Sequence, residues 1–135
     1  MAESTFQASI VTPESVLLET HASFAVVPAD DGLLGVLTHH APFITRMKPG
    51  VLKLTSPDGV YRFAVTGGYA QMQDNILTVL TDDAIAESAV NPELISSEEA
   101  KAQAMPSETA LQTHKRKAAL ARIEALRALA AIGDE

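Results

Sequence analysis

The chain of 135 residues has a hydrophobic content of 47%, a formal net charge of −7 and no cysteine. The length suits one domain of ordinary size or a small domain with an appendage, and the acidic balance argues against non-specific binding to nucleic acid, whose phosphates attract clustered Lys and Arg. Without cysteine there is no disulfide, thiolate nucleophile or sulfur metal site. The apolar runs are shorter than the roughly 20 residues of a membrane helix, and the first residues lack signal-peptide features, so we expect a soluble, unexported protein.

Residues 1–86 are predicted to form a β-sandwich of about eight to ten short strands. Apolar and polar residues alternate over 6–10 and 61–65 with the period of two that half-buried strands require. Further short apolar segments lie at 16–18, 24–27, 33–37, 51–54, 69–72 and 76–80. Turn signals rich in Gly, Pro, Asp and Asn separate them, and this spacing is typical of a sandwich or flattened barrel.

Residues 87–135 are predicted to form a C-terminal α-helical hairpin. From Ala84 onward alanine dominates the apolar residues and glycine is absent until Gly133, which favours helix. The charge changes as well, because residues 1–87 hold ten acids and four bases whereas residues 88–135 hold seven acids and six bases. This asymmetry indicates two modules with different partners.

The first helix of the hairpin has two competing start signals. Asn91 before Pro92 offers an N-cap followed by a proline at the first helical position. The Ser-Ser-Glu-Glu run at 96–99 offers a capping box instead, and we favour this second start. Pro106 then ends the helix, because proline interrupts the backbone hydrogen bonds of a helix interior.

The second helix is predicted to be the longer one, from about Glu108 to Ile132, with Ser107 as its N-cap. Apolar residues recur along it at helical spacing, at Leu111, Ala118, Ala119, Ile123, Leu126 and Ala130. Alanines bury little area, so we expect the hairpin to dock by only a few kcal/mol. An element that docks weakly can undock, which makes the hairpin a candidate switch.

Two motifs resemble chemical sites but lack the partners that chemistry needs. His39 and His40, adjacent on a strand, would point to opposite faces without a third ligand nearby in the sequence, so we predict no metal site. Gly67 and Gly68 are followed by no helix and no phosphate-binding lysine, so we predict a strand junction or bulge. The chain has no Gly-x-Ser-x-Gly elbow and no His-Glu-x-x-His helix, and we predict that it is not an enzyme.

Three stretches together carry a family resemblance. They are GLLGVLTHHAPFITRMKPG at 32–50, IVTPESVL at 10–17 and AVTGGYAQMQDNILTVLTDDA at 64–84. In this order and spacing they resemble the ε subunit of the F-type ATP synthase. The resemblance implies a β-sandwich over 1–86, a regulatory helical hairpin over 87–135, and a non-catalytic place in the central stalk that couples proton-driven rotation to ATP synthesis.

The resemblance also implies partners for the sandwich. The turn at Asp30, Asp31, Gly32 and Leu33 matches the loop that faces the membrane ring of c subunits, and His40 matches a histidine at the contact with the γ subunit. An acidic turn can meet basic or polar ring loops, where rim charges act mainly on orientation and association rate. The implied location is the cytoplasmic face of a bacterial inner membrane or, alternatively, the stromal side of a plastid thylakoid, without insertion into lipid.

For the second helix the resemblance implies an inhibitory role. Arg116, Arg122 and Arg127 match basic residues that contact the catalytic α and β subunits and block ATP hydrolysis. Some relatives bind ATP through an Ile-Asp-x-x-Arg-Ala motif, but Ser96 and Glu99 replace its two key residues, so we expect neither ATP binding nor another cofactor. A free-standing sensor of a small ligand is the alternative.

Overall fold

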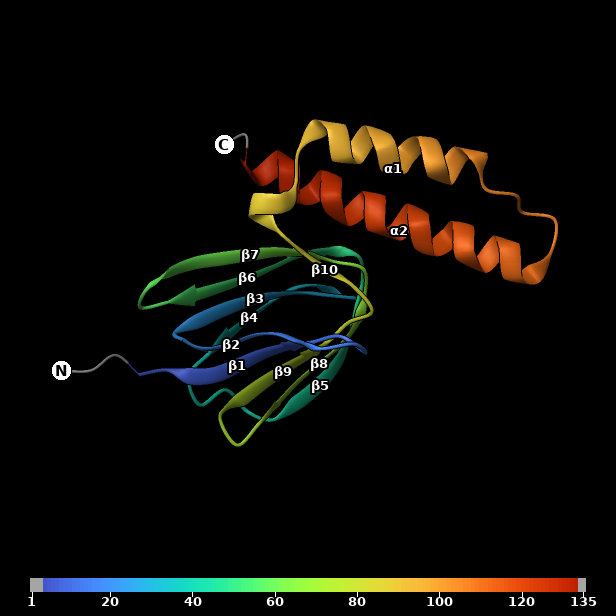
Figure 1. Cartoon of the computed structure of the whole chain (residues 1–135). Coiled ribbons are helices and arrows are strands. Elements are labelled where there is room, and N and C mark those ends of the chain that lie inside the picture. The colour runs from blue at the N-terminus through green and yellow to red at the C-terminus, as the bar shows by residue number, and fades with distance from the viewer. Residues whose placement is uncertain (1–3, 134–135) are drawn as a thin grey trace.

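Ten β-strands precede two α-helices in the computed structural model, which describes residues 4–133 (Figure 1). The strands are β1 (Phe6–Val11), β2 (Val16–Ala22), β3 (Phe24–Ala29), β4 (Gly32–Leu37), β5 (Phe43–Met47), β6 (Gly50–Ser56), β7 (Gly59–Val65), β8 (Gly68–Gln73), β9 (Ile76–Leu80) and β10 (Ala84–Ala86). A short 3-10 turn, η1 (Glu87–Ala89), leads to α1 (Pro92–Ala104) and α2 (Ala110–Gly133). The predicted sandwich followed by a helical hairpin is confirmed.

The strands form one curled sheet in the order β10-β7-β6-β3-β5-β8-β9-β1-β2, with β4 paired to β3. All pairs are antiparallel except β1 and β9, where Gln7 is opposite Ile76. The curl brings two halves of the sheet face to face around one apolar core, which includes Phe6, Ile10, Leu52, Leu54, Met72 and Leu77. Burial alternates residue by residue along β6, as the period of two requires.

The Gly67–Gly68 pair forms the predicted strand junction. Both residues have positive φ, at 122° and 109°. Residues other than glycine rarely adopt such a backbone conformation. A Cβ on Gly68 would also collide with the backbone carbonyl of Leu80 on the neighbouring strand. The chain can therefore pass from β7 into β8 here only with glycine.

Two strands were absent from the sequence-based prediction. β5 follows the proline at position 42 and pairs along its whole length with β8, with Arg46 opposite Tyr69. β10 lies where alanine content favoured helix, but it pairs with β7 and places Ile85 opposite Ala64. Tertiary pairing decides the conformation of such short segments more strongly than intrinsic propensity does.

The first helix begins at the signal that we ranked second. Asn91 is the N-cap, and its side-chain Oδ1 accepts a hydrogen bond of 2.8 Å from Leu94 N. Pro92 occupies the first helical position, where its missing N–H is not needed. The predicted start at 96–99 is therefore wrong, and Ser96 and Ser97 lie inside the helix.

The second helix also begins later than predicted, with Thr109 rather than Ser107 as its N-cap. Thr109 Oγ1 accepts a hydrogen bond of 3.1 Å from Gln112 N, and Gln112 Oε1 accepts one of 3.2 Å from Thr109 N. This reciprocal pair is a Thr-x-x-Gln capping box, which satisfies two backbone donors at the helix start.

Only the C-terminal half of α2 packs against the sandwich. Ala125, Leu126 and Leu129 are buried there in a second apolar cluster with Ala64 and Ile85. The predicted apolar stripe is wrong in its first part, since Leu111 is 62% exposed and the beginning of α2 extends past the sheet (Figure 1).

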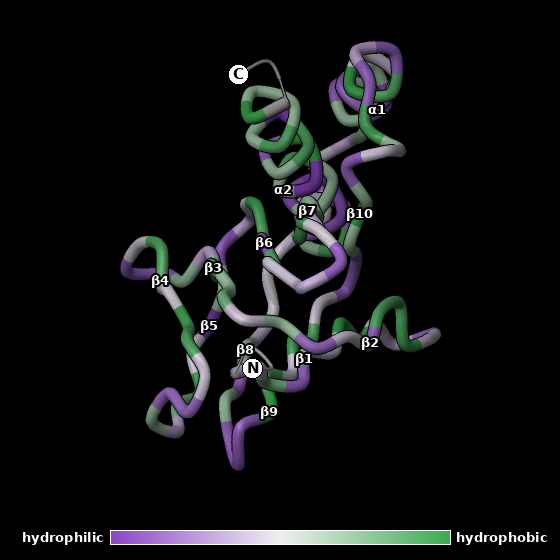
Figure 2. The backbone as a smooth tube through the Cα atoms, turned by 90° about the vertical axis from the view of Figure 1, so that its left-hand side faces the viewer, coloured by the Kyte–Doolittle hydropathy of each residue, from purple (hydrophilic) through white to green (hydrophobic). Residues whose placement is uncertain are grey.

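The two helices lie in layers over β6 and β7, with α2 between α1 and the sheet (Figures 1 and 2). Within residues 4–133, neither helix combines the length and apolar character needed to span a membrane.

Candidate functional site

The turn at 30–33 is an exposed acidic tip on a fixed backbone. It connects β3 to β4, where Ala29 and Gly32 form the last pair, and Gly32 has φ of 131°. Asp30 N donates a hydrogen bond of 3.0 Å to Arg46 O on β5. The carboxylates of Asp30 and Asp31 face solvent, and Leu33 beside them is 75% exposed. The tip thus offers charge and an apolar side chain together.

His39 and His40 lie in the turn after β4, so the assumption that they alternate on a strand is wrong. His39 has a φ of 60°, and its N–H donates a hydrogen bond of 2.7 Å to Asn75 Oδ1. His40 Nδ1 lies 2.8 Å from Ala41 O, and the ring packs edge-on against Phe43 with centroids 5.2 Å apart. His40 is thereby oriented at the start of β5.

The outer face of β5, β8 and β9 carries a mixed apolar and basic patch. Arg46, Tyr69 and Leu80 are neighbours across the three strands, and Ile44 lies on the same side of β5 as Arg46. Ile44, Tyr69 and Leu80 are 70%, 47% and 46% exposed. We call Ile44, Arg46, Tyr69 and Leu80 the β5–β8–β9 patch.

Arg46 and Tyr69 lie opposite each other in this patch. The neighbouring Tyr69 side chain and the charge of Asp30 raise the pKa of the Arg46 guanidinium. A surface hollow of about 380 Å³ borders Tyr69 and Leu80. The sequence analysis missed the patch because it did not predict β5, although the apolar pair at 43–44 was a visible signal.

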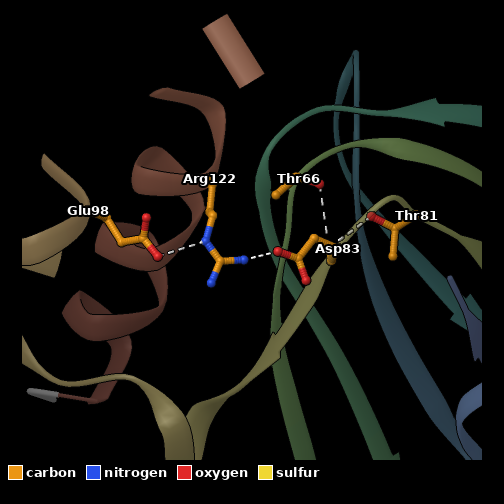
Figure 3. Close-up of polar contacts among 5 residues, drawn as sticks. All are labelled: Thr66, Thr81, Asp83, Glu98 and Arg122. Atoms are coloured by element: carbon orange, nitrogen blue, oxygen red, sulfur yellow. Dashed lines mark hydrogen bonds and ion pairs between the residues drawn. The ribbon is translucent and has the colours of Figure 1, made fainter. Parts of the chain in front are cut away.

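Each of the three arginines predicted to be inhibitory donates a hydrogen bond to another part of the chain in this structure. Arg116 Nε donates to Ala102 O at 3.3 Å. Arg122 Nε donates to Glu98 Oε1 at 3.2 Å, while its Nη1 pairs with Asp83 (Figure 3). Arg127 Nε donates to Glu99 Oε1 at 3.1 Å. In the folded hairpin each of these arginines thus has an acceptor on α1 or in the loop that precedes β10, while the side chain of Arg127 remains 61% exposed.

Asp83 is itself held at the edge of the sandwich. Its backbone carbonyl accepts hydrogen bonds from Thr81 Oγ1 at 3.0 Å and from Thr66 Oγ1 at 3.5 Å (Figure 3). Glu99, which stands where an ATP-binding motif would carry arginine, pairs with Arg127, and Ser96 faces solvent on α1. A carboxylate at this position repels a phosphate rather than binding it.

A groove of about 500 Å³ connects the acidic tip with the end of α2. Pro28 and Leu33 line it from β3 and β4, and Ala128 and Ile132 line it from α2. Within residues 4–133, no group of three or more His, Asp or Glu side chains is arranged to hold a metal ion.

Comparison with known proteins gives consistent matches. The family model of the ATP synthase delta/epsilon chain β-sandwich domain matches residues 5–87. The ATP synthase epsilon chain of Rhodopirellula baltica is 39% identical over 113 residues, which cover 84% of this chain and 88% of that one. The ATP synthase epsilon chain of Delftia acidovorans is 35% identical over 122 residues, which cover 90% of this chain and 85% of that one.

Two solved structures share the fold. A chain of the Euglena gracilis mitochondrial ATP synthase, from an assembly of OSCP, F1 and c-ring, superposes with a TM-score of 0.75 and 19% identity, covering 95% of this chain and 82% of that one. A chain from the central stalk and c-ring of the Tetrahymena thermophila mitochondrial ATP synthase gives a TM-score of 0.64 and 14% identity, covering 94% and 97%.

Proposed function

The chain belongs to the family of ATP synthase epsilon chains, and from this premise we propose that it acts as a non-catalytic coupling piece of the central stalk. The observation that carries the proposal is the family match over residues 5–87, which includes every strand of the sandwich. A closed sandwich with a close-packed core deforms little, as transmission of rotation between two larger bodies requires. The relatives reported above are all subunits of a complex, so the alternative of a free-standing ligand sensor finds no support.

The β5–β8–β9 patch and His40 form the surface proposed to contact the γ subunit. Tyrosine and arginine are enriched at the energetic centres of protein interfaces, and here the pair Arg46 and Tyr69 is flanked by exposed Ile44 and Leu80. His40 borders the same strand through its packing on Phe43. Exposed apolar side chains gathered on a rigid sheet need a partner to cover them.

The turn at 30–33 is the proposed contact with the ring of c subunits. It projects from the sandwich, its backbone is anchored to β5 through Asp30 N, and it combines two carboxylates with exposed Leu33. Rim charges of this kind direct orientation and add little affinity, which suits a contact that must hold its register during rotation.

The hairpin is the proposed regulator. In the folded state Arg116, Arg122 and Arg127 each pair with an acceptor of the chain itself, and on release they would meet acidic segments of the catalytic α and β subunits and restrain ATP hydrolysis. The ion pair between Glu99 and Arg127 supports a folded state that needs no bound ATP. The two epsilon chains reported above, from Rhodopirellula baltica and Delftia acidovorans, come from bacteria, which favours the cytoplasmic face of a bacterial inner membrane as the location.

Affinity capture of the tagged chain from its native membranes tests the proposal. We expect recovery with the γ, α and β subunits. The variant Tyr69→Glu should lose γ while keeping its fold, because it places a charge at the centre of the patch. Val60→Glu is the matched control, since Val60 is equally exposed on β7, outside the patch. Recovery of the wild-type chain without γ would contradict the assignment.

A further inference from the structure

Residues other than glycine that have positive φ gather at one place in this fold. Within residues 4–133 they are His39, Asp74 and Asn75, with φ of 60°, 53° and 62°. They belong to two turns that lie far apart in the sequence, one between β4 and β5 and the other between β8 and β9. Such backbone conformations persist where the surrounding structure holds them, commonly at functional sites. The junction of the two turns is therefore a candidate functional feature.

The turn after β4 has a histidine where glycine is usual. His40 N donates a hydrogen bond of 3.1 Å to Leu37 O, which closes a four-residue turn. A positive φ at the third residue of such a turn is typical of type II, and glycine or asparagine normally occupies that position. Here the third residue is His39, whose side chain disfavours the conformation. The turn therefore needs support from outside its own four residues.

Asn75 supplies this support from the turn between β8 and β9. Its Oδ1 accepts a hydrogen bond of 2.7 Å from His39 N, an N–H that a type II turn does not itself use. Its Nδ2 donates one of 3.1 Å to Thr5 O, and its backbone carbonyl accepts one of 3.2 Å from Gln7 N. Because one side-chain partner is an N–H and the other a carbonyl, only one orientation of the amide satisfies both. Asn75 thus ties the turn at 37–40, the β8–β9 turn and the beginning of β1 together.

Asparagine suits this position by its backbone as well as by its side chain. Asp74 and Asn75 form a two-residue hairpin loop with positive φ at both residues, flanked by the pair of Gln73 and Ile76. This type I′ geometry favours Asn, Asp and Gly. Of these three residue types, Asn alone offers both an acceptor for an N–H and a donor for a carbonyl at neutral pH.

We infer that Asn75 is a positioning residue, which fixes the turn at 37–40 and through it the His40 ring for the contact with the γ subunit. The inference rests on the proposed function, in which His40 belongs to the γ-facing surface. His40 directly follows His39, and its ring lies edge-on to Phe43 with centroids 5.2 Å apart. A surface that is fixed before contact loses less conformational entropy on association, so the Asn75 bond should raise the affinity for γ.

Two substitutions at position 75 separate the roles of its side chain. Asn75→Gly removes both side-chain hydrogen bonds and keeps a residue that accepts positive φ. Asn75→Asp keeps the acceptor for His39 N and loses the donor to Thr5 O, again with a residue type that the loop favours. Asp74→Gly is the matched control, because it puts the same flexible residue into the same loop. The exposed Asp74 side chain takes no part in the hydrogen bonds between the two turns.

Nuclear magnetic resonance of the full chain reads the turn without any partner. The exchange rate of the His39 amide reports its hydrogen bond, and Overhauser contacts between the His40 and Phe43 rings report the ring orientation. Asn75→Gly should speed this exchange about tenfold, the effect of losing one hydrogen bond, and should weaken the ring contacts. Asn75→Asp and Asp74→Gly should resemble the wild type. Dispersed signals of the core strands in the same spectra show that each variant is folded.

Affinity for γ is then measured with the catalytic part of the native enzyme from which this chain has been removed. Asn75→Gly should bind about tenfold more weakly, and Asn75→Asp should restore the affinity. An unchanged His39 amide in Asn75→Gly, an equal loss in Asp74→Gly or no rescue by Asn75→Asp would each overturn the positioning role. Wild-type affinity of Asn75→Gly beside a loss in His40→Ala would overturn it as well. Wild-type affinity of His40→Ala would instead contradict the proposed γ contact at His40.

Discussion

The sandwich and the hairpin of this chain are stabilised by different contacts. The sandwich is built around large, fully buried apolar side chains, such as Leu52 and Leu77. The outer helix α1 is attached by two half-buried glutamates, two half-buried aliphatic residues and one alanine. A body that transmits force needs the first kind of contact, whereas a regulator that must be released needs the second.

The largest expected effect separates the two regions by their stability. Leu52→Ala should lower the free energy of unfolding by about 3 kcal/mol, since it leaves a cavity in a core that cannot collapse around it. Leu111→Ala, at an exposed position on α2, should change it by less than about 0.5 kcal/mol. Urea unfolding followed by circular dichroism measures both. Similar losses in the two variants would mean that the regions are not packed as differently as the structure indicates.

Removal of the hairpin is the next test of the division. A chain that ends after Ala86 keeps all ten strands and should still assemble with γ and support proton coupling. Loss of the hairpin should raise the rate of ATP hydrolysis, because the arginines of α2 can no longer reach the catalytic subunits. The assay compares hydrolysis and proton pumping in membranes that carry the full or the shortened chain. Failure of the shortened chain to assemble would contradict the assignment of separate roles to the sandwich and the hairpin.

A smaller effect is expected at the acidic tip. Asp31→Arg combined with Leu33→Arg should weaken coupling without unfolding the sandwich, because both side chains are exposed and the backbone of the turn is fixed by Gly32 and by Asp30 N. Proton pumping in reconstituted vesicles is the readout, and thermal unfolding of the isolated chain is the check on folding. Glu19→Arg, on exposed β2, is the control, and pumping equal to this control would count against the ring-facing role.

The sequence was sufficient for the architecture because period-two alternation and turn residues act locally. It was insufficient for β5 and β10, where pairing with β8 and β7 decides the conformation, and for the helix starts, where Asn91 and Thr109 cap instead of Ser96 and Ser107. The Thr-x-x-Gln pattern at 109–112 was present but was not recognised.

Some of the candidate sites could be located from local sequence signals, and others depend on contacts between distant parts of the chain. The tip at 30–33 follows from a local turn signal and could be located in advance. The pairing of Arg122 with Asp83 and Glu98 joins residues 39 and 24 positions apart in the chain, and no local pattern predicts such a contact. The β5–β8–β9 patch likewise depends on register between strands that are distant in sequence.

Native-state hydrogen exchange of the full chain tests most directly whether a rigid sandwich carries a releasable helix. The account predicts that α1 amides exchange through openings of about 1–2 kcal/mol, that strand amides of the core exchange only near the global unfolding free energy, and that the C-terminal half of α2 lies between them. Raising the salt concentration should speed exchange in α1 alone. Protection of α1 equal to that of the core strands, at low and high salt, would contradict the account.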